Sequence, residues 1–450
     1  MAGPPTSWSR GTASGLAEPG SRPPRAAILV TGNEVLRGLI QERNAGFLAR
    51  SLVARGVEPE QTIIVGDALE DLVGALRGLL GRGVDLICTS GGLGPTHDDR
   101  TMAAVAEAVG AELAVDRAAL PLVRAAYGGG PRSGVGAQTQ RAIDEKQASL
   151  PVGSTLLPPI GTAPGCLLLH EGTLIVVLPG PPWELAAMWE AALENEPLRA
   201  LLERAPVGPR RILRLYGVVE SQFVESFERL PPDLRDAVEV GVCARAAELE
   251  VAIASPPGAE AAAEAMARAV LDAFGDAVYS PDGRTVEAIV AEALVRRDET
   301  LAVAESCTGG GLGARLTARP GASAYFLGGV IAYDDALKRG LLGVPAELLA
   351  VHGAVSPECA IAMAEGARRA GGSDWALSVT GVAGPGGGTP AKPVGLVYIG
   401  VAGPAGATAH ELRLRGDRER IRERATQRAL HLLRLALSAG AQEGRAGTPR

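Results

Sequence analysis

The sequence is poor in aromatic residues, which make up 3% of its 450 residues, and it contains only 5 histidines. Hydrophobic residues still reach 46%, so the cores must be built mainly from Ala, Val, Leu and Ile. No cluster of Lys and Arg is interleaved with aromatic residues, and the formal net charge is -7. An acidic chain without a basic, aromatic surface is not expected to contact nucleic acid directly.

The sequence also lacks the cysteine and histidine spacings of disulfide and zinc sites. Its 5 cysteines are odd in number and scattered, and neither a CxxC nor an HExxH pattern occurs. We therefore expect reduced thiols in a cytoplasmic protein. No apolar run approaches the length of about 18 residues that a transmembrane helix needs, so no membrane association is predicted.

The order of strand and helix patterns predicts an α/β protein with several domains. Residues 1–24 are rich in Pro, Gly and Ser and are expected to be a disordered extension. Alternating strands and helices over 25–180 predict a parallel sheet covered by helices on both faces. Residues 181–282 predict a small α+β connecting domain, and residues 283–438 predict a second α/β domain. Residues 439–450 are expected to be a flexible tail.

In the second α/β domain, a polar turn follows an apolar run at 301–304 that predicts a buried strand. Ser306 and Cys307 come at the end of this strand, followed by glycines and a possible helix start. Such a turn exposes backbone N–H groups to an anion or a developing oxyanion. Ser306 is the preferred nucleophile, and Cys307 is the rival because a thiol at a helix start is activated. The alternative is a glycine-rich helix start capped by a serine.

Two further strand ends of this domain carry polar residues. Tyr333 follows an apolar run at 328–332, with Lys338 five residues later, and Thr380 follows a run at 375–379. Because the ends of parallel strands meet at one edge of a sheet, we expect them to converge with Ser306. The cluster would supply a nucleophile, a proton carrier and N–H donors in a Ser-Lys or Ser-Tyr arrangement that needs no histidine.

Three other residues of the domain can each be interpreted as functional or as purely structural. His352 lies in a turn before the helix predicted at 357–369 and is expected to be structural. Arg418 and Arg422 are one turn apart on the last predicted helix. They would either clamp a phosphate or lie on an exposed helix face.

In the first domain, the most informative loop spans 90–101. Its glycines allow a phosphate to approach the backbone closely, and Asp98 and Asp99 follow them. Carboxylates beside a phosphate make sense if a divalent cation bridges them. The alternative is that one of the two aspartates only caps the following helix.

The stretches 91–101, 161–165 and 178–184 resemble the molybdopterin-binding-like domain of the competence/damage-inducible protein A (CinA) family, over most of 25–250. The resemblance implies a three-layer α/β fold and a metal-dependent ADP-ribose pyrophosphatase, with Asp98 and Asp99 holding Mg²⁺ or a similar ion. Two positions depart from the family, since Asn33 replaces Thr or Asp and Arg43 replaces Thr. The residues that the resemblance places around the phosphate or nucleotide are Glu34, Gly91, Gly92, Gly94, Thr101, Lys146, Gly161, Gly165, Pro179, Gly180 and Glu184.

The stretches 304–310, 328–333, 353–356, 380–388 and 392–397 are similar to the C-terminal domain of the same family, over about 285–435. That resemblance implies a nicotinamide-nucleotide amidase, which converts nicotinamide mononucleotide to nicotinate mononucleotide and ammonia without a cofactor. Ser306 would be the nucleophile, Tyr333 and Lys338 would assist proton transfer, and Thr380 with neighbouring amides would stabilise the reacting group. Substrate contacts are expected from Cys307, Thr308, Gly309, Gly310, Gly381, Gly384, Arg418 and Arg422.

The resemblance further implies that the partners are small nucleotides, namely nicotinamide mononucleotide and ADP-ribose, and that the protein is a homodimer. It also leaves a second interpretation of the first domain. That domain would be a non-catalytic pterin- or nucleotide-binding module in a CinA-like competence or damage-response protein.

Overall fold

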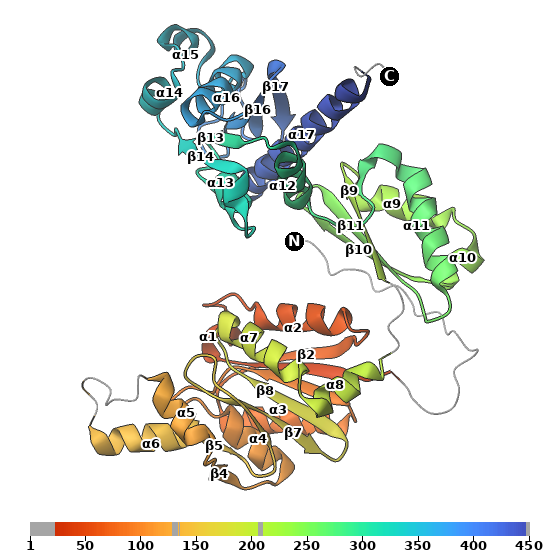
Figure 1. Cartoon of the computed structure of the whole chain (residues 1–450), viewed down its shortest axis with the longest axis vertical. Coiled ribbons are helices and arrows are strands. Elements are labelled where there is room, and N and C mark those ends of the chain that lie inside the picture. Colours follow the sequence, from red (N-terminus) through yellow and green to blue (C-terminus); the bar gives the residue numbers. More distant parts are fainter. Residues whose placement is uncertain (1–22, 128–133, 135, 206–209, 447–450) are drawn as a thin grey trace. The chain divides into compact units, whose positions relative to one another are not determined.

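The computed structural model describes residues 23–127, 134, 136–205 and 210–446, and side chains up to residue 438. The chain divides into two compact units, Met1–Gly208 and Pro209–Arg450 (Figure 1). No helix among the described residues is long and apolar enough to cross a membrane. The extension predicted at 1–24 lies almost wholly outside the described residues.

The first unit contains a six-stranded sheet in the order β2-β1-β3-β8-β7-β6. The pairs β1–β2, β1–β3 and β3–β8 are parallel, as predicted, whereas β7 and β6 add an antiparallel edge that the sequence did not indicate. β4 and β5 form a separate antiparallel pair. The strands are β1 (Ala26–Thr31), β2 (Pro59–Val65), β3 (Leu86–Ser90), β4 (Leu113–Val115), β5 (Ser149–Pro151), β6 (Thr155–Leu157), β7 (Gly165–His170) and β8 (Thr173–Leu178).

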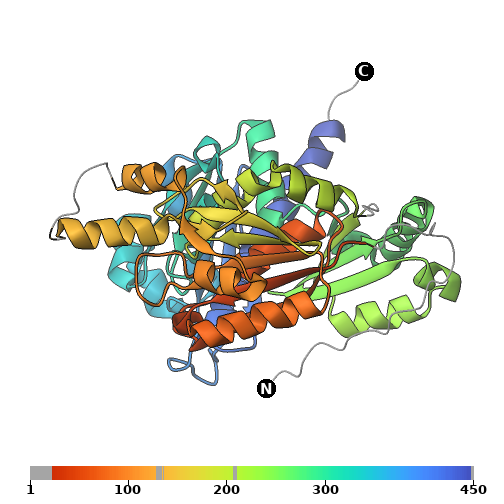
Figure 2. The same ribbon diagram turned by 90° about the horizontal axis from the view of Figure 1, so that it is seen from below.

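Helices cover both faces of this sheet (Figures 1 and 2), and each face has its own apolar core. One core contains Leu185, Met188, Trp189 and Leu198, so the first unit extends well past residue 180. The boundary predicted at 180/181 is therefore too early, because the helices that follow it bury their apolar faces on this sheet. The helices are α1 (Asn33–Leu36), α2 (Asn44–Val53), α3 (Leu69–Gly81), α4 (Thr101–Val109), α5 (Ala119–Ala126), α6 (Ala137–Gln147), α7 (Pro182–Leu193) and α8 (Glu196–Glu203).

The second unit begins with the predicted α+β domain, an antiparallel sheet in the order β10-β11-β9-β12. Its core is formed by alternate strand residues such as Leu249, Val251 and Ile253, packed against helix residues such as Phe223 and Met266. Period-two burial along β11 is typical of a sheet with one covered face. The elements are β9 (Arg210–Tyr216), α9 (Glu220–Glu228), α10 (Pro232–Asp236), β10 (Glu239–Arg245), β11 (Glu248–Ala254), α11 (Glu260–Phe274), a 3₁₀ turn (Gly275–Ala277) and β12 (Val278–Ser280).

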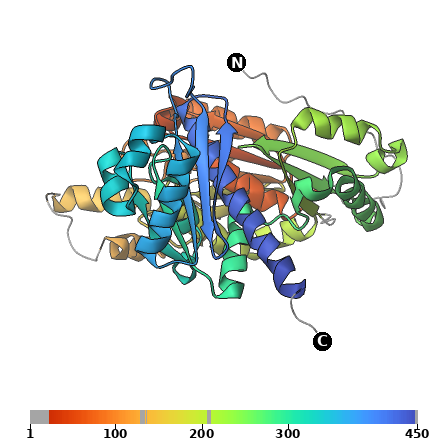
Figure 3. The same ribbon diagram turned by 90° about the horizontal axis from the view of Figure 1, so that it is seen from above.

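The rest of the second unit is a five-stranded sheet in the order β14-β13-β15-β16-β17. The pairs β13–β14 and β13–β15 are parallel, and β16 and β17 continue the sheet antiparallel. Separate apolar cores lie on its two faces, one of them including α17 residues such as Ile421 and Leu433 (Figure 3). The elements are α12 (Val286–Arg297), β13 (Leu301–Glu305), α13 (Gly311–Thr317), a 3₁₀ turn (Ala322–Ala324), β14 (Phe326–Ile331), α14 (Asp335–Leu342), α15 (Ala346–His352), α16 (Pro357–Gly371), β15 (Trp375–Gly381), β16 (Leu396–Gly403), β17 (Gly406–Arg413) and α17 (Arg418–Ala446).

The last helix is longer than its sequence pattern predicts. α17 continues to Ala446, so the tail predicted from residue 439 is helical over most of its length. Residues 439–446 contain Ala, Gln, Glu and Arg, which favour a helix, together with Gly440 and Gly444, which disfavour one.

Candidate functional site

Three strand ends of the C-terminal sheet converge as predicted. In the sheet register, Glu305 at the end of β13 lies opposite Ile331 of β14 on one side and opposite Val379 of β15 on the other. These pairings continue through hydrogen bonds from Ala332 N to Glu305 O (2.8 Å) and from Ser306 N to Val379 O (2.9 Å). Neighbouring strands are about 4.8 Å apart, so Ser306 lies between the chain segments that carry Tyr333 and Thr380.

The turn after Ser306 is held by the carboxylate of Glu305. This side chain is 2% exposed and accepts hydrogen bonds from Gly310 N (3.0 Å), Leu312 N (3.0 Å) and Gly313 N (2.8 Å). These amides are therefore not free to bind a substrate anion, contrary to what the sequence predicted for the turn. The Glu305 carboxyl group already occupies the place where an anion or a developing oxyanion was expected.

The same turn is tight for steric reasons. Gly309 and Gly310 adopt positive φ values of 57° and 94°, which glycine tolerates without strain. Arg422 donates from Nε (3.3 Å) and Nη2 (2.7 Å) to the carbonyl of Thr308. A carboxylate and a guanidinium thus fix the turn from two sides.

Ser306 and Cys307 differ in the chemistry they can perform. Ser306 is 9% exposed, and among the described residues none forms a hydrogen bond with its hydroxyl. The Cys307 side chain is 4% exposed, and burial raises the pKa of its thiol to about 12. A thiol that stays protonated is a poor nucleophile. The geometry therefore favours Ser306.

Tyr333 and Arg418 form a bridge across the edge of the sheet. Arg418 Nη2 donates to the phenol oxygen of Tyr333 (2.9 Å), and Arg418 Nη1 donates to the carbonyl of Gly384 (2.8 Å). The Tyr333 side chain is 57% exposed, so a ligand can reach it. The bridge connects the end of β14 to the glycine-rich loop after β15 and to the first turn of α17.

Lys338 and Thr380 are engaged in supporting contacts. Lys338 is 1% exposed, and its Nζ donates to Tyr333 O and to Asp335 Oδ1, both at 3.1 Å. The Thr380 hydroxyl donates to the carbonyl of Ala354 (2.7 Å), so its only proton is already used. In this arrangement both residues position the loops around Ser306, and Thr380 can offer a ligand only its lone pairs.

Gly381 and His352 have structural roles. A Cβ at Gly381 would lie 2.7 Å from the carbonyl oxygen of Leu396, so the glycine permits close packing against β16. His352 is a partly exposed residue whose Nδ1 is 3.4 Å from Glu358 Oε1, which agrees with its expected structural role.

In the first unit, a cavity of about 460 Å³ lies at the ends of β1, β3 and β8. Predicted site residues that line it are Glu34, Gly91, Gly92, Gly94, Asp98, Asp99, Pro179, Gly180 and Glu184. Four predicted residues do not line it, namely Thr101, Lys146, Gly161 and Gly165. Each of these four supports the cavity wall or the sheet from behind.

Thr101 and Gly161 shape the cavity from outside. The Thr101 hydroxyl donates to Gly91 O (2.7 Å), and a Cβ at Gly92 would lie 2.3 Å from that hydroxyl oxygen. A Cβ at Gly161 would lie 2.2 Å from the carboxyl carbon of Glu184. Gly165 lies against the carbonyl oxygen of Val177, to which a Cβ would approach within 2.4 Å, so its role is packing within the sheet.

The two aspartates of the glycine loop share a hydroxyl and a nearby ammonium. Thr96 donates from its amide to Asp99 Oδ2 (2.9 Å), and its hydroxyl contacts both Asp98 and Asp99. The Thr96 hydroxyl lowers the pKa of Asp98, and Lys146 Nζ contacts the Thr96 carbonyl. Both aspartates are thus ordered by the loop itself.

The donor set fits a hard divalent cation only in part. No group of three or more His, Cys, Asp or Glu side chains is gathered for a metal among the described residues. Mg²⁺ commonly takes one or two carboxylates and completes its octahedron with water and substrate phosphate. Asp98 and Asp99 match that pattern, and they would hold such an ion together with the substrate.

Glu184 and Asn44 are notable in this cavity. Burial raises the pKa of the Glu184 carboxyl, which is 8% exposed. Asn44, which was not among the predicted site residues, donates from Nδ2 to Ser90 Oγ (2.9 Å) and to Gly180 O (2.6 Å), and so joins the ends of β3 and β8. Its position directly after the substituted Arg43 was the only sequence signal for it.

Comparisons with known proteins agree with both resemblances. Residues 283–437 match the CinA C-terminal domain, and residues 27–199 match the probable molybdopterin binding domain. The chain is 45% identical over 423 residues to the CinA-like protein of Mycobacterium sp. (strain JLS), covering 92% of this chain and 99% of that protein. It is 42% identical over 423 residues to the CinA-like protein of Mycobacterium tuberculosis (strain ATCC 25177 / H37Ra), covering 92% and 97%.

Among solved structures, the chain is similar to a competence-damaged protein (CinA) superfamily protein from Klebsiella pneumoniae. The two are 37% identical with a TM-score of 0.34, and the match covers 34% of this chain and 96% of that chain.

Proposed function

The chain belongs to the CinA family, and from this premise we propose that it is a pyridine-nucleotide recycling enzyme with two active sites. The C-terminal domain hydrolyses the carboxamide of nicotinamide mononucleotide to nicotinate mononucleotide and ammonia. The first unit cleaves ADP-ribose at its pyrophosphate with a divalent metal. The observation that carries the first activity is the register that brings Ser306, Tyr333 and Thr380 to one sheet edge.

In the proposed amidase reaction, Ser306 Oγ attacks the carboxamide carbon, and its proton passes to the Tyr333 hydroxyl while that hydroxyl releases its own proton to the carboxamide nitrogen. The C–N bond then breaks, ammonia leaves, and a nicotinoyl ester remains on Ser306. Water attacks this ester and releases nicotinate mononucleotide. Splitting the hydrolysis in this way replaces one difficult step by two easier ones.

The charges around Ser306 support this assignment. Arg418 fixes the phenol of Tyr333 and has further N–H donors for the 5′-phosphate. Arg422 and Glu305 hold the turn, so Ser306 is already in position before the substrate binds. Cys307 is excluded as nucleophile in this proposal, because its buried thiol stays protonated at neutral pH.

Ammonia release from nicotinamide mononucleotide by the purified protein tests the amidase assignment. Ser306→Ala is expected to lower the rate by about 10³-fold or more, as for other serine nucleophiles. Cys307→Ser is the matched control and should remain close to wild type. Full activity of Ser306→Ala, or loss only in Cys307→Ser, would refute the assignment.

For the first unit, the cavity with its glycine loop and two ordered aspartates supports pyrophosphate cleavage. A bound divalent ion would neutralise charge on the pyrophosphate, while Asp98 and Asp99 hold it. Glu184, whose pKa is raised by burial, lines the same cavity and is placed to exchange a proton there.

The match to the probable molybdopterin binding domain favours a second candidate, a module that binds a pterin or nucleotide without cleaving it. Release of AMP and ribose 5-phosphate from ADP-ribose, measured with Mg²⁺ and with EDTA, separates the two. Cleavage that requires the metal supports the pyrophosphatase, and tight pterin binding without any cleavage supports the alternative.

A further inference from the structure

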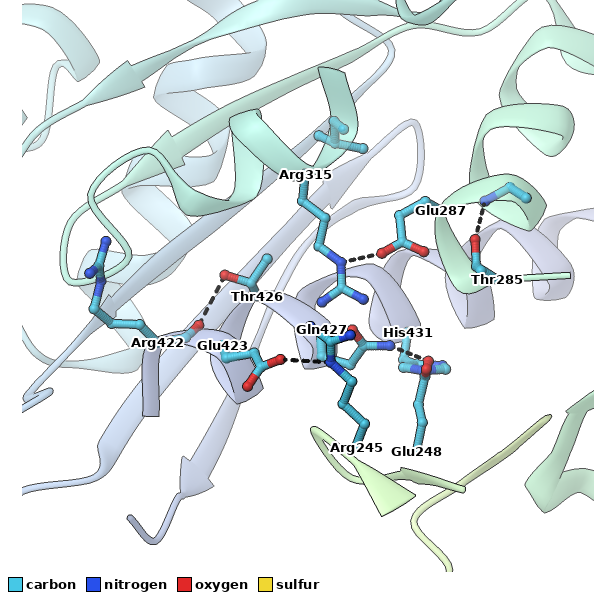
Figure 4. Close-up of polar contacts among 12 residues, drawn as sticks. Arg245, Glu248, Thr285, Glu287, Arg315, Arg422, Glu423, Thr426, Gln427 and His431 are labelled. Atoms are coloured by element: carbon cyan, nitrogen blue, oxygen red, sulfur yellow. Dashed lines mark hydrogen bonds and ion pairs between the residues drawn. The ribbon is translucent and has the colours of Figure 1, made fainter. Parts of the chain in front are cut away.

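Besides the cavity of the first unit, a second cavity lies in the second unit, and it has no part in the proposed reaction. Its volume is about 730 Å³, and it lies where the connecting sheet meets the C-terminal domain. One face of α17 forms one side, and residues of β9, β10 and β11 form another (Figure 4). Ser306, Tyr333 and Thr380 are not among its lining residues. The volume suits a ligand the size of a mononucleotide.

The lining of this cavity combines guanidinium and carboxylate groups. Arg214 Nη2 lies 2.7 Å from Glu250 Oε2, Arg245 Nε lies 3.4 Å from Glu423 Oε1, and Arg315 pairs with Glu287. A guanidinium has five N–H donors, so one carboxylate leaves several of them unused. The Arg245 side chain is 85% exposed in its pair, and such pairs contribute little to stability. Exchanging its carboxylate for a ligand therefore costs little.

Two buried polar atoms of the lining have no hydrogen-bond partner in the described part of the chain. They are Gln427 Oε1 and Thr308 Oγ1, on side chains that are 1% and 0% exposed. Buried polar groups are normally paired with protein, water or ligand. In Figure 4, Gln427 lies between Arg315 and Arg245, and all three residues line the cavity.

We propose that this cavity binds a nucleoside monophosphate. The unused N–H groups of Arg245 and Arg315 hold the phosphate in the bidentate manner that guanidinium groups favour. The carboxylates of Glu419 and Glu423 accept hydrogen bonds from the ribose hydroxyls, as acidic side chains do in other nucleotide sites. A lining of both charges matches a ligand with an anionic end and a hydroxyl-rich middle.

The cavity is connected to the nucleophile through two residues. Arg422 lines the cavity and donates to the carbonyl of Thr308, and Thr308 lies two residues after Ser306 in the same turn. A ligand that contacts Arg422 or Thr308 in the cavity acts on the turn that positions Ser306. Occupancy of the cavity and substrate affinity at Ser306 are therefore coupled, and the coupling must be reciprocal.

Chemical labelling of Cys243 can report directly whether a ligand occupies this cavity. Cys243 lines the cavity and is the exposed member of the five free cysteines, while the other four are buried. The measurement is the rate at which a maleimide alkylates Cys243 in the full-length protein, with AMP as the probe. At an AMP concentration of about ten times Kd, alkylation is expected to slow about tenfold. Adenosine at the same concentration, which lacks the phosphate, is expected to give no protection.

Variants show whether the protection arises in the cavity. Arg245→Ala is expected to raise the Kd for AMP about tenfold, the loss of one charge-assisted contact. Arg211→Ala is the matched control, because Arg211 belongs to the same sheet and pairs with Glu264 outside the lining. Cys243→Ser identifies the alkylated thiol, since the label must disappear.

Three results would overturn the proposal: no protection by AMP, equal protection in Arg245→Ala and wild type, or equal protection by inorganic phosphate alone. The readout needs no turnover of nicotinamide mononucleotide. Failure here is therefore distinguishable from failure of the amidase assignment.

Discussion

The two proposed active sites hold their anionic groups in opposite ways. At the C-terminal site the carboxylate of Glu305 is 2% exposed and is hydrogen-bonded to three backbone amides. In the first unit Asp98 is exposed, and its loop is ordered mainly through Thr96. A carboxylate saturated by the protein positions a turn, whereas a carboxylate with free lone pairs can bind a metal. The C-terminal site is therefore preorganised, whereas in our proposal the site of the first unit is completed by an ion.

The largest difference between the two activities is expected from a substitution of Asp99. Asp99→Asn removes one of the two charges proposed to hold the metal and should lower ADP-ribose cleavage by about 10³-fold, the equivalent of several kcal/mol of lost charge stabilisation. Ammonia release from nicotinamide mononucleotide should be unchanged in the same preparation. A parallel fall of both activities would show that the variant is misfolded, and unchanged cleavage would remove Asp99 from the site.

A smaller effect is expected at Glu305. Glu305→Gln keeps the shape but loses one acceptor oxygen, so the turn loosens and amide hydrolysis should fall about 10²-fold, the effect of a small misplacement of a catalytic group. The fall should appear in kcat more than in KM, because substrate contacts remain. Unfolding free energy, measured with urea, should fall by about 1–3 kcal/mol for the amides left unpaired. Wild-type kcat in this variant would show that the carboxylate does not position Ser306.

Much of this contrast could be predicted from the sequence. The remaining parts could not be predicted, and there are physical reasons for this. The strand ends carrying Ser306, Tyr333 and Thr380 followed from apolar runs and glycine turns, because parallel strands align their ends. The sequence could not show that Glu305 would fold back onto the turn, since that depends on side-chain direction. For the same reason Thr380 was expected to face the substrate, whereas its hydroxyl donates to Ala354.

The boundary of the first unit shows a second limit of sequence patterns. Helices α7 and α8 look alike whether they pack on the preceding sheet or the following one. The choice is made by tertiary contacts such as those of Trp189, whose indole donates to Ser51 Oγ (2.7 Å) on α2. The antiparallel strand β6 was missed because it has only three residues, and β7 was missed although it has six.

A still smaller effect concerns the steric support of Glu184. Gly161→Ala would place a Cβ 2.2 Å from the carboxyl carbon of Glu184, so the side chain or the turn must shift. Overpacking of this kind costs about 1–3 kcal/mol, which should appear in urea unfolding of the first unit followed by its tryptophans. Ala at Gly74, an exposed helix position where an added Cβ meets nothing within 4 Å, is the control and should not destabilise. Equal stability of the two variants would contradict the packing described for Gly161.

The smallest expected effect is a change in pH dependence. Burial raises the pKa of Glu184 above its ordinary value of 4.5, so the folded protein holds this proton more tightly than the unfolded chain. The resulting stabilisation is complete below about pH 4.5 and is lost as pH rises through the folded pKa. Glu184→Gln should therefore flatten the fall of stability with rising pH in that window, as measured by urea unfolding at several pH values. An unchanged slope would show that Glu184 is solvated.

In the proposed amidase reaction, Ser306 forms a covalent ester as the amide bond breaks. Mass spectrometry of the protein quenched during turnover of nicotinamide mononucleotide tests it most directly. An added nicotinoyl nucleotide is expected on the peptide that contains Ser306, absent from Ser306→Ala and retained in Cys307→Ser. An adduct on Cys307, or steady ammonia release by Ser306→Ala, would contradict it.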